Sequence, residues 1–182
     1  MHKLIVSDTD FLSSFAKIDE LELVFRVFKT KEIVITEAVY NELKEAPVFD
    51  LLLTYFSAKE NKIIIKKVSA KGVPESLGEG ERASISLAKD KKAKLLMDDR
   101  DAGEYTEKVG VKVIDIPSFL FYCKRKKILN TPQLKTIISK LKAKDFYEFE
   151  RGVEKALVSD NKLQGHSHKK HRMRQKSPNH PL

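Results

Sequence analysis

The hydrophobic pattern of the chain alternates between short β-branched runs and longer amphipathic stretches. The run EIVIT at residues 32–36 is typical of a buried strand, whereas Leu21, Val24, Phe25 and Phe28 recur at the spacing of one helix face. We predict strands at residues 3–7, 32–36, 62–68, 93–97 and 111–114. We predict helices at residues 9–17, 20–28, 37–45, 48–58, 81–91, 117–127, 132–142 and 145–158, with a loop over 71–80.

This order of elements indicates an α/β fold. Strands separated by helices favour parallel βαβ units, and short apolar strands suit a sheet that is covered on both faces. Because crossover connections are right-handed, we predict a three-layer α/β/α sandwich around a mostly parallel five-stranded sheet. The periodic pattern stops after residue 159. We therefore assign residues 1–160 to one domain and residues 161–182 to a basic, His-containing, disordered tail.

Acidic residues occur where such a sheet binds ligands. Ligands bind beyond the carboxyl ends of parallel strands, at the point where the strand order reverses. Acids follow the first and the fourth predicted strands, and others lie on the helix after the second strand and at the start of the helix before the fourth. These residues are Asp8, Asp10, Glu42, Glu79, Glu81, Asp98 and Asp99.

Taken one at a time, these acids have structural explanations. An Asp after a strand can cap a helix, a lone helical Glu is usually solvated, and Ser76 with Glu79 fits a capping box. The capping box favours Glu81 over Glu79 as the functional residue. Acids gathered from four segments would repel one another, and a hard cation with a preference for oxygen ligands would relieve that repulsion. We therefore predict a Mg²⁺ or Mn²⁺ site.

Composition narrows the chemistry further. No histidine occurs between residues 3 and 165, which disfavours Ser–His, Cys–His and zinc–His catalysis. The single cysteine, Cys123, excludes an internal disulfide and favours the cytoplasm. The net charge is +9, and residues 162–182 contribute six bases and no acid, which suggests a nucleic-acid partner. No apolar run is long enough to span a membrane, so we expect no membrane association.

Five segments, in order, resemble a PIN domain, the metal-dependent nuclease fold of VapC-type toxins. They are LIVSDTDFL, VITEAVYNEL, LGEGERASISLA, LLMDDRDA and VKVIDIPSFL, and the resemblance covers residues 3–150. The chain is most similar to the prokaryotic subgroup with a GEGE helix. The resemblance implies Mg²⁺- or Mn²⁺-dependent endoribonuclease activity, a homodimer and, for toxins, a small antitoxin protein that blocks the site.

The resemblance also implies roles for single residues. The four acids of the family pattern match Asp8, Glu42, Glu81 and Asp99. Glu79 competes with Glu81 for the third position, and Asp98 shares the role of Asp99. Asp10 departs from the pattern, since the family usually has Ser or a similar small polar residue there. The longer Glu at the third position and the basic tail are further departures.

Two other functions remain open. A PIN-fold chain could bind RNA or a protein without cutting. Alternatively, Asp8-Thr9-Asp10 resembles the D-x-D motif of haloacid-dehalogenase-like phosphatases, and Asp98-Asp99 resembles their metal-binding acids. The usual Gly-Thr of that motif is Phe11-Leu12 here, and Glu42 and the GEGE helix would have no role.

Overall fold

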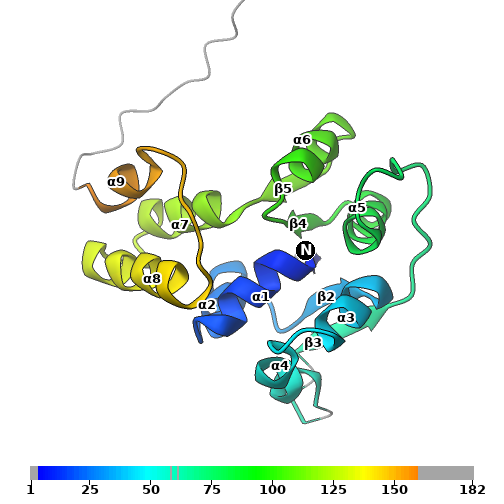
Figure 1. The fold of residues 1–182 in the computed structure, drawn as a ribbon, viewed down its shortest axis with the longest axis horizontal. Coiled ribbons are helices and arrows are strands. Elements are labelled where there is room, and N and C mark those ends of the chain that lie inside the picture. Colours follow the sequence, from blue (N-terminus) through cyan, green and yellow to red (C-terminus); the bar gives the residue numbers. More distant parts are fainter. Residues whose placement is uncertain (1–3, 58, 61, 160–182) are drawn as a thin grey trace, which may run out of the picture.

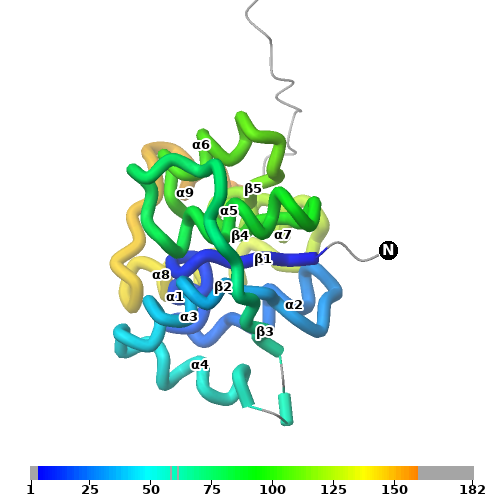
Figure 2. The backbone as a smooth tube through the Cα atoms, turned by 90° about the vertical axis from the view of Figure 1, so that its right-hand side faces the viewer, coloured from blue at the N-terminus to red at the C-terminus, as the bar shows by residue number. Residues whose placement is uncertain are grey.

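The computed structural model describes residues 4–57, 59–60 and 62–159, and the predicted tail at 161–182 lies outside them. Five strands form one sheet in the order β3-β2-β1-β4-β5, and every pair of neighbours is parallel. Figure 2 shows the strands in this sequence from β5 at the top to β3 at the bottom. The strands are β1 (Ile5–Ser7), β2 (Ile33–Thr36), β3 (Ile63–Lys66), β4 (Lys94–Leu96) and β5 (Lys112–Ile114). The predicted α/β fold is confirmed.

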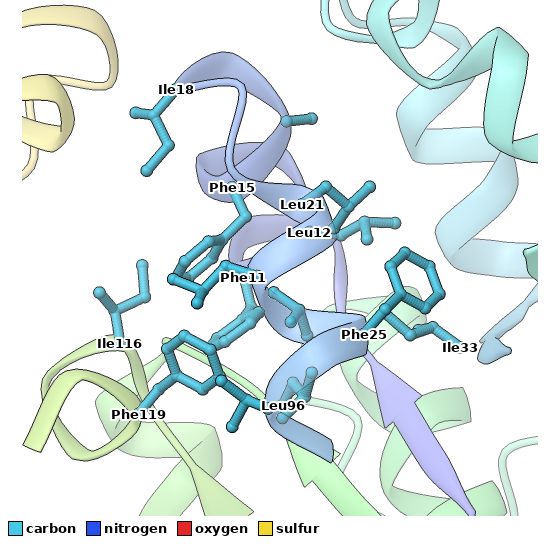
Figure 3. Close-up of a cluster of buried hydrophobic side chains, with 14 of the residues drawn as sticks. Phe11, Leu12, Phe15, Ile18, Leu21, Phe25, Ile33, Leu96, Ile116 and Phe119 are labelled. Atoms are coloured by element: carbon cyan, nitrogen blue, oxygen red, sulfur yellow. The ribbon is translucent and has the colours of Figure 1, made fainter. Parts of the chain in front are cut away.

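Helices cover both faces of the sheet (Figure 1). They are α1 (Thr9–Lys17), α2 (Leu21–Phe28), α3 (Glu37–Lys44), α4 (Phe49–Phe56), α5 (Glu79–Lys91), α6 (Arg100–Lys108), α7 (Ile116–Arg125), α8 (Thr131–Lys144) and α9 (Val153–Val158). Successive strand residues point to opposite faces, so Ile5 and Val6 enter different cores. The larger core contains Phe11, Phe15 and Phe119, whose rings pack edge-to-face or stacked (Figure 3). The smaller core lies beneath α5 and α6.

The largest differences from the predicted elements are one helix that was not predicted and one that was predicted too long. Helix α6 was absent from the sequence prediction because RDAGEYTEK is strongly polar and buries only Ala102 and Thr106. The helix predicted over 145–158 was wrong in its first half, since α8 ends at Lys144 and α9 begins only at Val153. The Asp145 side chain accepts hydrogen bonds from Ser14 and Lys17 of α1, and these contacts hold the segment 145–150 outside any helix.

The sheet topology brings two acidic segments together. Strand β1 lies between β2 and β4, so the strand order reverses beside β1. The Asp8 backbone N–H donates to the Leu96 carbonyl at 2.9 Å, which places the end of β1 against the end of β4. Asp8, Asp98 and Asp99 therefore lie at the switch point where ligands bind in open α/β sheets. Within the part of the chain that the structure describes, no helix is long and apolar enough to cross a membrane.

Candidate functional site

Asp8 is fixed and buried between two strand ends. Its Oδ1 accepts from the Phe11 N–H at 2.9 Å, which caps α1, and its Oδ2 accepts from the Asp98 N–H at 3.2 Å. Only 3% of its surface is exposed. Burial raises the pKa of Asp8 well above its usual range, and the neighbouring charges of Asp10 and Asp98 act in the same direction. The structure therefore disfavours a negative charge here unless a cation compensates it.

The two acids after β4 point in different directions. Asp99 caps α6 by accepting from the Ala102 N–H at 2.7 Å. Asp98 instead accepts from the Ile116 N–H at 2.9 Å and from the Tyr147 hydroxyl at 3.2 Å. Its carboxylate thus lies against the start of α7, and burial raises its pKa to about 6. The charge of Asp10 contributes to the raised pKa of Asp98, and the charge of Asp99 contributes to the raised pKa of both Asp10 and Glu81.

Glu42 joins α3 to the start of α5. Its Oε1 accepts from the Gly80 N–H at 2.9 Å, and its Oε2 accepts from the Thr9 hydroxyl of α1. A Cβ on residue 80 would lie 2.5 Å from both of these carboxylate oxygens. Only glycine allows the carboxylate this close to the helix.

Glu81, and not Glu79, completes the capping box of α5. Helix α5 begins at Glu79, two residues earlier than predicted, and its N-cap is Gly78. The Glu81 carboxylate accepts from the Gly78 N–H at 2.9 Å. The capping box predicted between Ser76 and Glu79 is therefore wrong, because the helix starts two residues too late for Ser76 to be its N-cap. Glu79 occupies the first turn of α5 and is exposed to solvent.

Charge links acids from four separate elements. Desolvation raises the pKa of Asp10, and the charges of Asp99 and Glu42 raise it further. Desolvation likewise raises the pKa of Glu81, with added contributions from Asp99, Asp10 and Glu42. The acidic cluster, defined as Asp8, Asp10, Glu42, Glu81 and Asp99, is thus gathered at one edge of the sheet. Sequence reasoning placed Asp10 among the strand-end acids but did not assign it to the metal site, because it departs from the family pattern.

The donor chemistry of the acidic cluster fits a hard divalent cation, since every candidate ligand is a carboxylate oxygen. Burial and the neighbouring carboxylates raise the pKa values of Asp8, Asp10 and Glu81, so a positive charge among them would favour their ionised forms. The carboxylates of Asp8, Glu42, Glu81 and Asp99 accept hydrogen bonds from backbone amides, and that of Glu42 also accepts one from Thr9. Among the described residues, no group of three or more His, Cys, Asp or Glu side chains is already arranged to hold a metal ion.

Comparison with known families decides the classification. The family model described as a PIN domain matches residues 4–162. The chain belongs to the PIN domain family. PIN domains are generally metal-dependent nucleases, and the resemblance seen in the sequence is confirmed at the level of the family.

This PIN domain was also compared with solved structures and with curated proteins. A solved PilT N-terminus domain protein from the hyperthermophilic archaeon Sulfolobus solfataricus P2 is similar to it with 20% identity and a TM-score of 0.45. That similarity covers 65% of this chain and 91% of the archaeal chain. No curated protein matches the chain.

Proposed function

We propose that this PIN domain is a Mg²⁺- or Mn²⁺-dependent endoribonuclease that hydrolyses RNA phosphodiesters. The supporting observation is the acidic cluster at the switch point of the sheet, where burial raises the pKa of Asp10 and Glu81 and the charges of Glu42 and Asp99 raise it further. Uncompensated carboxylates at this position, in a family of metal-dependent nucleases, are best explained by a cation that they bind.

Each proposed ligand has a defined structural support. We propose Asp8, Glu42, Glu81 and Asp99 as the metal-binding acids, with Glu79 and Asp98 in support. Two backbone amides orient the Asp8 carboxylate, and Thr9 orients that of Glu42. A bound divalent cation would lower the pKa of its water and shield the charge of the phosphate. Asp10 adds negative charge beside these ligands, which strengthens their attraction for the cation.

Partners are proposed from the family. We propose that RNA is the substrate and that the chain forms a homodimer in the cytoplasm. We also propose that it acts as the toxin of a toxin–antitoxin pair, with a small antitoxin protein that blocks the acidic cluster. The alternative is a PIN domain that binds RNA or protein without cutting. It takes support from the carboxylates' present hydrogen bonds to backbone amides.

The direct test is cleavage of a labelled RNA with Mn²⁺, with Mg²⁺ and with EDTA. We expect endonucleolytic products with either cation and intact RNA with EDTA, measured on a denaturing gel. Intact RNA after incubation of the folded protein with Mn²⁺, over RNAs of several sequences, would reject the nuclease and favour the binding module. Release of phosphate from a phosphomonoester, without RNA cleavage, would favour the phosphatase.

A second test uses the close approach of Glu42 to α5. A Gly80→Ala variant places a methyl group where the Glu42 carboxylate now lies, so that carboxylate must move. We expect cleavage to fall by about 10- to 100-fold, the range seen when the support of a metal ligand is disturbed. Stability should change by less than about 1 kcal/mol, because the gain in helix propensity offsets a lost hydrogen bond. Cleavage rates and urea unfolding measure the two effects.

Gly103→Ala is the matched control. Gly103 lies inside α6, and a Cβ there would meet no atom within 4 Å. We expect this variant to gain about 0.5–1 kcal/mol of stability and to cleave RNA at the wild-type rate. Equal cleavage by Gly80→Ala and the wild type would show that the position of Glu42 is unimportant for the reaction.

A further inference from the structure

Phe146 is an exposed aromatic residue just after the end of α8. It lies directly after α8, exposes 83% of its surface, and has a φ of 54°. Lys29, Lys92 and Lys127 adopt the same left-handed conformation after α2, α5 and α7, so this φ belongs to the way α8 ends. The hydrophobic core does not explain why a phenylalanine occupies this position, since its ring is exposed.

The residues on either side hold Phe146 in place. Asp145 accepts from the Ser14 hydroxyl at 2.5 Å and from Lys17 Nζ at 2.6 Å, which ties the segment to α1. Tyr147 donates its hydroxyl to Asp98, and its ring packs edge-to-face on Phe149 at 4.7 Å between centroids. The flanking side chains thus turn toward the protein, while the Phe146 ring faces solvent.

This segment borders the acidic cluster. The charge of Asp145 contributes to the raised pKa of Asp10, so the two carboxylates are near each other. Tyr147 lines a pocket of about 470 Å³ that Asp98 and Asp99 also line. Phe146 therefore lies between Asp145, which contacts α1, and Tyr147, which contacts Asp98 at the end of β4. In Figure 1 the segment between α8 and α9 passes beside α1.

The surroundings of Phe146 favour a nucleobase over a protein partner. The other large hydrophobic residues that are exposed in the described part of the chain lie at the start of β1, on α4 and on β3. They are Leu4, Leu51, Leu53 and Ile65. Phe146 thus lies apart from the other exposed hydrophobic side chains. Tyr147 and Phe149 nearby are partly buried against the core, and the remaining neighbours in sequence, Lys144, Asp145 and Glu148, are polar. A lone aromatic face with polar neighbours suits a base, which has an aromatic face and polar edges.

We propose that Phe146 is a stacking platform for an unpaired base of single-stranded RNA beside the acidic cluster. This inference rests on the proposed function and specifies its substrate as RNA with at least one unstacked nucleotide next to the cleavage site. Stacking on an exposed ring is tolerant of base identity, so Phe146 would select single strands over duplexes without reading a sequence.

Fluorescence gives a direct test, because the chain contains no tryptophan. In a Phe146→Trp variant the only indole stands at the proposed platform. We expect a single-stranded RNA oligonucleotide to quench its emission, and a blunt RNA duplex of the same sequence to leave it unchanged. Ca²⁺ supplies a hard cation during binding, and a gel confirms that the RNA stays intact. Leu51→Trp on α4, at another exposed position, is the control and should not respond to either RNA.

Affinity measurements separate stacking from simple apolar contact. We expect Phe146→Leu and Phe146→Ala to bind single-stranded RNA about tenfold more weakly, and Phe146→Tyr to bind like the wild type. All three should melt within a few degrees of the wild type, because the ring is exposed. Wild-type affinity in Phe146→Leu, or no quenching in Phe146→Trp, would overturn the proposal. So would a dimer that dissociates on Phe146→Ala, since the ring would then belong to a protein interface.

The outcomes for the platform and for the nuclease are distinguishable. RNA binding that depends on Phe146, without cleavage in Mn²⁺, would support the platform and reject the nuclease. Cleavage by the wild type with unchanged affinity in Phe146→Leu would support the nuclease and reject the platform.

Discussion

An Asp8→Asn variant is expected to lose RNA cleavage by at least about 100-fold while it remains folded. The substitution removes one negative charge from the acidic cluster at almost constant volume. Even the outer-shell partners of metal ligands contribute 10- to 100-fold to affinity or activity, so a direct ligand should contribute no less. Cleavage rates in Mn²⁺ and the affinity for Mn²⁺ should fall together.

The structure explains why this variant should keep its stability. Burial raises the pKa of Asp8, which means that its ionised form is unfavourable in the folded protein. An asparagine oxygen can still accept from the Phe11 N–H and cap α1, since Asn and Asp are equally good caps. The contact with the Asp98 N–H is weakened at a cost of about 1 kcal/mol. Removal of the buried charge offsets that cost.

Asp115→Asn is the matched control for Asp8→Asn. Asp115 caps α7 by accepting from the Ser118 N–H at 2.7 Å, so both variants change Asp to Asn at the N-cap of a helix that follows a strand. We expect Asp115→Asn to cleave RNA at close to the wild-type rate. Cation-dependent cleavage retained by a pure preparation of Asp8→Asn would remove Asp8 from the metal site.

The fold was predictable because the hydrophobic pattern of most segments agrees with their burial in the folded protein. Strand β2 (Ile33–Thr36) is β-branched and buried on both faces, and α2 carries Leu21, Val24 and Phe25 on its inner face. Helix α6 could not be found in this way, since it contributes only a narrow buried strip. The segment 145–150 could not be found either, because contacts with Ser14 and Asp98, more than 45 residues away, determine its path.

The site was predictable as a set of strand-end acids but not in its geometry. Sheet topology alone places Asp8 beside the end of β4, so the acids after these strands had to converge. The different directions of Asp98 and Asp99 depend on which amide each carboxylate caps, and no pattern in the sequence records that choice. The role of Glu81 in the cap depends on the helix start at Glu79, which propensity places only within a few residues.

Asp98→Asn is expected to stabilise the protein above pH 6. The pKa of Asp98 rises from 3.8 to about 6 on folding, chiefly through burial. Between these values the folded state binds more protons than the unfolded state, so wild-type stability falls as pH rises through this window. The full shift corresponds to about 3 kcal/mol. Asparagine has no charge to bury, and its oxygen can accept from the Ile116 N–H and the Tyr147 hydroxyl as Asp98 does.

The measurement is the free energy of unfolding by urea from pH 4 to pH 8, with EDTA present. We expect Asp98→Asn and the wild type to be equally stable near pH 4, to diverge between pH 4 and pH 6, and to differ by about 3 kcal/mol above pH 6.

Tyr147→Phe is a second variant that tests the same titration. The Tyr147 hydroxyl lowers the pKa of Asp98, so its loss should extend the wild-type decline to higher pH. A constant difference across this range would show that another group titrates. If Asp98→Asn also retains cleavage while Asp99→Asn loses it, the metal-binding role after β4 belongs to Asp99, whose charge acts on Asp10 and Glu81.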